Sequence, residues 1–184
     1  FFAKNYDKSY STFKSIQDER YKKYKPKMNV SIIDKLLNHM KDNNMFPSLF
    51  FVFSKKKCEE FAERIVQSLV TSKEAAEAKH IFNMKLKSYK KTYEETPQFN
   101  QVIKLLEKGI CFHHADVIPV LKEIIEILFQ KGLIKVLFVT ETMAAGLNMP
   151  AKTVAFTSLQ KFTNKGRRAL LPYEYTQMAG RGGR

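Results

Sequence analysis

One stretch of sequence decides the fold, and it reads Lys135-Val136-Leu137-Phe138-Val139-Thr140-Glu141-Thr142-Met143-Ala144-Ala145-Gly146-Leu147-Asn148-Met149-Pro150. Its apolar run at 136–139 predicts a short strand covered on both faces, which is typical of parallel sheets. The polar turn that follows lies beyond the carboxyl end of this strand, where open α/β sheets bind ligands. A threonine hydroxyl and a helix N-terminus at such a turn favour a phosphate group. An ordinary strand-to-helix turn has a similar composition, so this stretch alone leaves both interpretations open.

Short apolar runs and amphipathic segments alternate along the rest of the chain. Further strands are expected at 49–53, 110–112 and 153–156. From the spacing of apolar residues, helices are expected at 30–40, 57–70, 102–106 and 117–131. Ser31 is a possible N-cap of the first helix, and Gly109 is expected to adopt the left-handed conformation after the third. This alternation predicts an α/β fold, with right-handed crossovers and helices on both faces of a parallel sheet.

The 184 residues fit one domain with an N-terminal extension. Residues 1–28 mix aromatic residues with lysines without a clean period, which indicates a linker or the tail of a preceding domain. Residues 29–184 form the expected domain, and its polar segment at about 71–97 is interpreted as a variable insertion on the surface. Because the chain begins without Met and stops within a Gly/Arg string, we expect it to be a segment of a longer protein.

The formal net charge of +14 is concentrated at the two ends of the chain. Nucleic acid is the leading class of partner, because clustered cations gain affinity by displacing counterions from phosphates. A lysine-rich solvated surface is the alternative. No apolar run is long enough to span a membrane. Cys58 and Cys111 make neither a disulfide framework nor a zinc site, so a reducing intracellular compartment is expected.

The sharpest local signal is the C-terminal string Gln177-Met178-Ala179-Gly180-Arg181-Gly182-Gly183-Arg184. At the start of a helix or in a tight loop, its two arginines can reach one small polyanion, and its glycines allow close backbone approach. The alternative is a disordered RNA-binding tail, against which the string occurs once and follows a helix-compatible segment.

Two other groups of residues are assigned structural roles from the sequence. His113 and His114 are adjacent and cannot share one face of a strand or helix, so no metal site is expected there. Cys58 lies on an amphipathic helix and is interpreted as core packing.

Several segments, taken in order, resemble a known family. They are Phe51-Val52-Phe53-Ser54-Lys55-Lys56-Lys57-Cys58-Glu59-Glu60, Gly109-Ile110-Cys111-Phe112-His113-His114-Ala115, the stretch 136–150, Phe156-Thr157-Ser158-Leu159-Gln160-Lys161-Phe162, and the Q-x-x-G-R-x-G-R string at 177–184. Together they resemble the second RecA-like domain of superfamily 2 DExH RNA helicases, most closely the superkiller branch with its exosome-associated members. The resemblance covers about 49–184, and only loosely at 71–97.

The resemblance implies roles for individual residues. Those implied to face the ATP γ-phosphate are Gln177, Arg181 and Arg184. Those implied to bind the rest of the nucleotide are Gly146, Asn148 and Gly180. Those implied to touch the RNA backbone are Ser54, His113, His114, Thr140 and Thr142. The chain departs from the family at Asp116, where Gly is usual, and at Gly182, where Ala is usual and where we expect a less rigid loop.

The phosphate loop G-x-x-x-x-G-K-[ST] and a DExH box do not occur in these residues. The resemblance places both on a preceding RecA-like domain, which would also hold most of the Mg²⁺ coordination. We therefore expect the full-length protein to be an ATP-dependent RNA helicase, and this segment alone to be inactive.

The resemblance further implies RNA processing, surveillance or decay as the setting. The expected partners are single-stranded or structured RNA, the preceding domain in cis, and exosome or adaptor proteins, at an intracellular location in the nucleus rather than the cytoplasm. Two alternatives stay open: a RecA-like RNA-binding or scaffold module that no longer hydrolyses ATP, and a DNA-directed helicase of the same superfamily.

Overall fold

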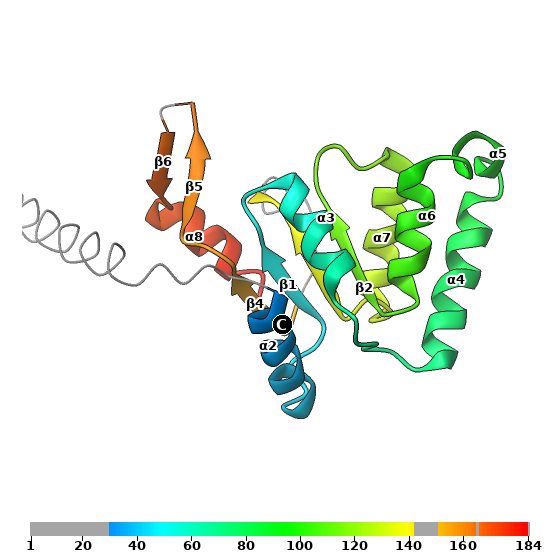
Figure 1. Cartoon of the computed structure of the whole chain (residues 1–184), viewed down its shortest axis with the longest axis horizontal. Coiled ribbons are helices and arrows are strands. Elements are labelled where there is room, and N and C mark those ends of the chain that lie inside the picture. The colour runs from blue at the N-terminus through cyan, green and yellow to red at the C-terminus, as the bar shows by residue number, and fades with distance from the viewer. Residues whose placement is uncertain (1–29, 142–150, 165, 184) are drawn as a thin grey trace, which may run out of the picture.

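The computed structural model describes residues 30–141, 151–164 and 166–183. Its centre is a parallel sheet of four strands in the order β2-β3-β1-β4 (Figure 1). The strands are β1 (Ser48–Phe51), β2 (Ile110–His113), β3 (Val136–Val139) and β4 (Thr153–Phe156). The α/β fold with a parallel sheet is therefore confirmed, and each strand lies within two residues of its expected bounds.

The apolar runs form strands because the sheet buries them on both faces. Every residue of β1, β2 and β3 is buried, whereas those of β4 are half-buried. Strands β2 and β4 both lie at edges of the sheet, but several helices pack against β2. Phe50 and Phe138, neighbours across the β1–β3 pair, place their ring centroids 5.2 Å apart. Cys58 is fully buried, and burial raises the pKa of its thiol to about 12. This confirms its structural role.

The helices pack around this sheet and around one another. Helix α3 contacts β2 and β3, helices α6 and α7 contact β2, and helix α4 packs on α6 and α7 (Figure 1). None of the helices in the described parts of the chain is both long and apolar enough to cross a membrane. Their bounds are α2 (Val30–Asp42), α3 (Lys55–Arg64), α4 (Ser72–Leu86), α5 (Lys90–Tyr93), α6 (Pro97–Leu106), α7 (Pro119–Gln130) and α8 (Pro172–Ala179).

Helix ends follow local chemistry, with two corrections. Shortly after α6, Gly109 has φ +68°, the expected left-handed conformation, which only glycine adopts without strain. Ser31 is not an N-cap, because it lies inside α2, which already includes Val30. The helix expected at 57–70 ends at Arg64, and the chain beyond it buries Ile65 and Leu69 without helical structure.

The polar segment at 71–97 is helical and lies partly in the core. A capping box between Thr71 and Glu74 starts α4, and the helix buries Ala78, Phe82 and Leu86. The expectation of a segment lying on the surface is therefore wrong for this face of α4. That the segment is an insertion relative to the family stays a prediction.

An antiparallel hairpin, formed by β5 (Gln160–Thr163) and β6 (Gly166–Ala169), was not expected from the sequence. It stands apart from the parallel sheet, on the side away from α4 (Figure 1). Helix α8 follows the hairpin, and the stacked rings of Tyr175 and Phe156, 5.0 Å apart, place it against β4.

Candidate functional site

The carboxyl edge of the sheet brings together residues that lie far apart in sequence. The ladders place Phe51, Val139 and His113 at one level, so the turns after β1, β2 and β3 are neighbours. The backbone N–H of Thr140 donates to the carbonyl of His113 at 3.4 Å. The expected RNA-contacting residues of three separate motifs therefore meet at this edge.

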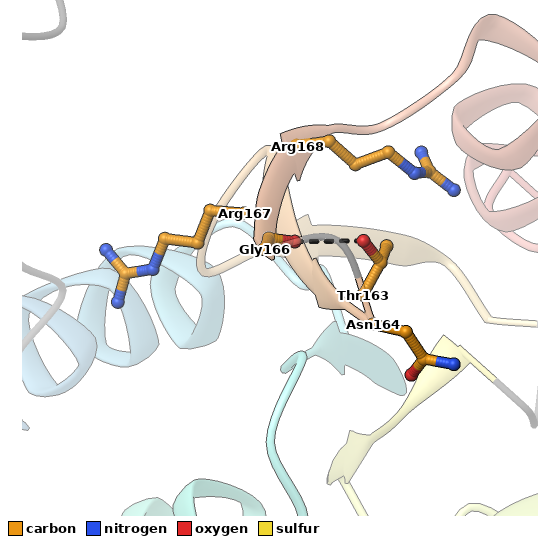
Figure 2. A pocket seen from close by; sticks show the side chains of 5 residues that line it. All are labelled: Thr163, Asn164, Gly166, Arg167 and Arg168. Carbon is orange, nitrogen blue, oxygen red and sulfur yellow. Dashed lines mark hydrogen bonds between the residues drawn. The ribbon is translucent and has the colours of Figure 1, made fainter.

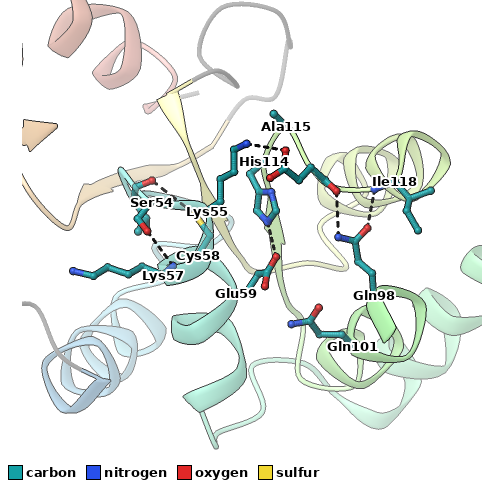
Figure 3. Close-up of polar contacts among 12 residues, drawn as sticks. Ser54, Lys55, Lys57, Cys58, Glu59, Gln98, Gln101, His114, Ala115 and Ile118 are labelled. Carbon is teal, nitrogen blue, oxygen red and sulfur yellow. Dashed lines mark hydrogen bonds and ion pairs between the residues drawn. The ribbon is translucent and has the colours of Figure 1, made fainter. Parts of the chain in front are cut away.

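Ser54 is placed by the turn from β1 into α3. It is half-buried and is the N-cap of α3, where its Oγ accepts from the backbone N–H of Lys57 at 3.4 Å (Figure 3). Lys55, Lys56 and Lys57 follow it and are exposed in the first helical turn. A helix N-terminus that also carries lysines is a favourable place for an anion. This edge can therefore attract phosphate, although sequence reasoning did not single out the lysines.

His113 and His114 do not face solvent, with relative exposures of 6% and 2%. The Nε2 of His113 lies 2.8 Å from Glu126 on α7, and that of His114 lies 2.9 Å from Glu59 on α3. Within the described residues, neither Nδ1 has a hydrogen-bond partner. Burial lowers the pKa of His113, against the opposing effect of its hydrogen bond to Glu126. These positions are against the expectation that the imidazoles touch RNA, because each ring already joins a strand end to a helix.

Thr140 is 6% exposed, so its side chain lies beneath the edge rather than on it. Thr142, Gly146 and Asn148, the other residues expected from this motif, lie outside the described residues.

Asp116 forms an ion pair with Lys55, with 2.7 Å between Oδ1 and Nζ. The hydrogen bond from Lys55 lowers the pKa of this exposed carboxyl. Asp116 does not cap α7, since the N-cap is Ile118. Gln98 on α6 instead holds the turn: its side chain accepts from the N–H of Ile118 at 2.7 Å and donates to the carbonyl of Asp116 at 3.4 Å (Figure 3).

The C-terminal string begins in the last turn of α8. Gln177 is exposed there, Gly180 is the C-cap, and Arg181 follows, half-buried. Of the two expected positions, the start of a helix is therefore wrong, because the string runs from the last turn of α8 into the loop that follows it. Arg184 lies outside the described residues.

Two backbone hydrogen bonds fix the loop after α8 to the start of β4. Ala151 donates to the carbonyl of Arg181 at 3.1 Å, and Gly183 donates to the carbonyl of Lys152 at 3.1 Å. Gly183 has φ +78°, a conformation that favours glycine. A Cβ on Gly182 would lie 3.1 Å from Cγ2 of Val154, so this glycine lets the loop approach β4 closely. The close contact between this loop and β4 therefore opposes the lower rigidity that we expected at Gly182.

The two groups of candidate residues lie at opposite ends of the sheet. The loop at 181–183 contacts the amino end of β4, whereas Ser54 and Thr140 follow the carboxyl ends of β1 and β3. Four strand residues at ~3.3 Å each separate the two ends by roughly 13 Å. This domain can thus present two separate polar surfaces, and none of the described His, Cys, Asp and Glu residues form a group of three that could hold a metal ion.

No family model matches the chain. The antiviral helicase SKI2 of Saccharomyces cerevisiae is 44% identical over 150 residues, which cover 81% of this chain and 12% of that protein. The ATP-dependent RNA helicase mtr4 of Schizosaccharomyces pombe is 43% identical over 163 residues, or 84% of this chain and 14% of that protein.

The exosome RNA helicase MTR4 of Mus musculus is 41% identical over 155 residues, covering 84% of this chain and 15% of that protein. The chain thus spans between about an eighth and a seventh of the length of these relatives. The similarity confirms the resemblance seen in the motifs. Over most of its length the chain is homologous to one segment of the SKI2/MTR4-type DExH RNA helicases, and it belongs to that family.

Proposed function

We propose that residues 29–184 are the second RecA-like motor domain of an ATP-dependent RNA helicase. The observation that carries the proposal is the docking of the loop at 181–183 against β4 through two backbone hydrogen bonds. Such docking fixes the backbone that carries Arg181, and an arginine finger requires a fixed backbone. The names of the relatives, which are ATP-dependent or exosome RNA helicases, support the reaction and the substrate class.

In this proposal ATP is the substrate, bound between this domain and a preceding one. The preceding domain supplies the phosphate loop and most of the Mg²⁺ coordination. Arg181 and Arg184 stabilise the negative charge of the transferring phosphoryl group, and Gln177 orients the γ-phosphate. Gly180, Gly146 and Asn148 line the rest of the nucleotide site. Closure and reopening of the cleft then couple hydrolysis to movement along RNA.

The RNA side of the proposed domain is the carboxyl edge of the sheet. Ser54 and Thr142 are the proposed contacts to the RNA backbone, with Lys55 to Lys57 adding positive charge beside Ser54. Thr140, which is 6% exposed, is proposed to support this edge from beneath. His113 and His114 serve this edge from beneath, because their pairs with Glu126 and Glu59 hold the carboxyl end of β2 against α7 and α3. We infer RNA processing or decay with exosome or adaptor partners, in the nucleus, as the cellular setting.

Arg184→Ala in the full-length protein tests the proposal most directly. Loss of an arginine finger is expected to reduce the turnover of ATP by about 10³–10⁵-fold. RNA affinity, measured by fluorescence anisotropy, should stay within about twofold, because Arg184 is assigned to the nucleotide. Steady-state hydrolysis of ATP at saturating RNA measures the first effect.

Arg64→Ala is the matched control, since Arg64 is an exposed arginine on α3 whose ion pair joins it to Glu60 of the same helix. It should leave turnover unchanged. A loss below about tenfold in Arg184→Ala would remove Arg184 from this role. RNA binding by a wild-type protein that hydrolyses no ATP would instead support a scaffold module, and stimulation by DNA alone would support a DNA-directed helicase.

A further inference from the structure

The hairpin β5–β6 carries two like charges directly opposite each other. Lys161 on β5 and Arg168 on β6 are cross-strand partners in its ladder. Like charges in such positions destabilise a strand pair. A two-stranded hairpin is also only marginally stable in isolation. Something outside the hairpin must therefore compensate the two cations.

Glu174, in the first turn of α8, provides this compensation. Its carboxylate accepts a two-pronged interaction from Arg168 at 2.7 and 2.8 Å and lies 2.7 Å from Nζ of Lys161. The side chain of Glu174 is only 12% exposed and that of Lys161 is 16% exposed. The hydrogen bonds from Arg168, and then from Lys161, hold the pKa of Glu174 far below its usual value, so it stays ionised at neutral pH.

The cluster also reaches the end of the central sheet. Lys161 lies 3.6 Å from Glu141, which follows Thr140 after β3. Residues from the hairpin, from α8 and from the carboxyl edge of the sheet thus meet around two cations and two carboxylates. The only acidic residue after residue 150 in the sequence is Glu174, which makes it the sole carboxylate that this basic region itself supplies.

Helix α8 is fixed to the sheet independently of this cluster. Tyr175 stacks on Phe156 of β4, and the loop after the helix bonds to Ala151 and Lys152 at the other end of the strand. The hairpin contributes no strand to the parallel sheet. Through its ion pairs, Glu174 therefore connects the projecting hairpin to α8, which leads into the arginine string (Figure 1).

The exposed side of the hairpin has the chemistry that single-stranded nucleic acid binds. Phe162 is 66% exposed, and the guanidinium of Arg167 lies 4.6 Å from the centroid of its ring. A hollow beside it is lined by Thr163, Asn164, Gly166, Arg167 and Arg168, and Figure 2 shows the two arginines extending in opposite directions from β6. Aromatic rings and cations together form a stacking and phosphate-binding surface.

We propose that Glu174 is a positioning residue that makes the hairpin and the arginine string move as one body, so that RNA on the hairpin affects ATP hydrolysis. This inference rests on the proposed function. If Glu174 acted only as the cap of α8, through its hydrogen bond to the N–H of Leu171 at 2.8 Å, its loss would lower all activities together with stability.

The test uses the full-length protein with the substitution Glu174→Gln. We measure ATP hydrolysis without RNA and at saturating single-stranded RNA, and take the ratio as the stimulation factor. Loss of one charge-assisted cluster is expected to lower this factor about tenfold. Arg168→Gln should give a similar loss, and the double variant should lose no more than either single one, because the two residues act as a pair.

Glu60→Gln is the matched control, since it breaks an ion pair of similar length, 2.8 Å, within α3. It should leave the stimulation factor unchanged. If Glu174→Gln does not fold, Arg168→Lys keeps the charge, loses the fork and should still lower the factor. An unchanged factor in Arg168→Gln and in every folded Glu174 variant, or an equal fall of both rates, overturns the inference alone. A wild-type protein whose hydrolysis RNA does not raise overturns the proposed function, and this inference with it.

Discussion

The parallel sheet and the hairpin β5–β6 are held in place by different forces. Strands β1, β2 and β3 are buried at every residue, and their neighbours are mainly aliphatic and aromatic. Half of the strand residues in the hairpin are exposed and the others are half-buried, and the hairpin contacts α8 through Lys161, Arg168 and Glu174. Apolar burial does not depend on protonation, whereas charge pairs weaken when a partner is neutralised and when salt screens them. The sheet is therefore a fixed frame, and the hairpin is a part whose position solution conditions can alter.

Phe138→Ala should give the largest effect, because it removes a fully buried ring that contacts Phe50 and Phe61. The expected loss in the free energy of unfolding is about 3–5 kcal/mol, measured by urea denaturation of the chain. Phe162→Ala, in the hairpin, is the control and should cost less than about 0.5 kcal/mol. Equal losses would mean that the hairpin is as much part of the core as the sheet is.

Gly109→Ala, compared with Gly132→Ala, separates backbone strain from side-chain packing around the sheet. Gly109 and Gly132 both have positive φ, of +68° and +70°. A Cβ on Gly109 would lie 2.4 Å from Cγ1 of Val70, whereas nothing lies within 4 Å of one on Gly132. We expect a loss of about 2–4 kcal/mol at Gly109, from strain plus displacement of Val70, and about 1 kcal/mol at Gly132, from strain alone. Similar losses in urea denaturation would show that packing at Val70 adapts freely.

Acid should loosen the hairpin before it affects the sheet. The pKa of Glu174 is strongly lowered in the folded chain, so its contribution to stability is complete above the unfolded pKa of about 4.3 and declines gradually as pH falls from there toward the much lower folded pKa. NMR resonances of residues 160–169 should therefore begin to shift only below about pH 4 and should go on shifting down to the lowest pH reached, while those of β1 and β3 stay constant. Glu174→Gln should abolish this pH dependence. Shifts of equal size in both regions would contradict the separation of forces.

Asp116→Gly should produce the smallest effect, at the carboxyl edge of the sheet. The substitution frees Lys55 from its 2.7 Å ion pair and removes a negative charge near the proposed RNA contacts. Because both side chains are at least half exposed, at 50% and 65%, the gain in RNA affinity should be only about twofold and should shrink as salt rises. Fluorescence anisotropy of the full-length protein at two salt concentrations measures it. Weaker RNA binding by the variant would mean that Asp116 orders the turn rather than competing with phosphate.

The strands of the frame could be predicted because each is recognisable within its own few residues. A continuous apolar run such as 136–139 requires cover on both faces, whatever the partner strands are. Gly109 was identifiable in the same way, since a helix end and a left-handed glycine are neighbours in the chain. The hairpin was missed because Gln160–Thr163 and Gly166–Ala169 are polar and charged, and their pairing produces no apolar alternation.

The sequence by itself determined the α/β class, the order of the strands along the chain and the family, because these depend on local patterns and on motifs that occur in a fixed order. Only the tertiary structure decided what the polar residues do. It buried His113 and His114 against Glu126 and Glu59, turned Asp116 toward Lys55, and gathered Lys161 and Arg168 around Glu174. The physical reason is that a charge or hydrogen-bonding group is defined by its partner. Glu59 and His114, 55 residues apart in the chain, become partners only when the strands and helices pack.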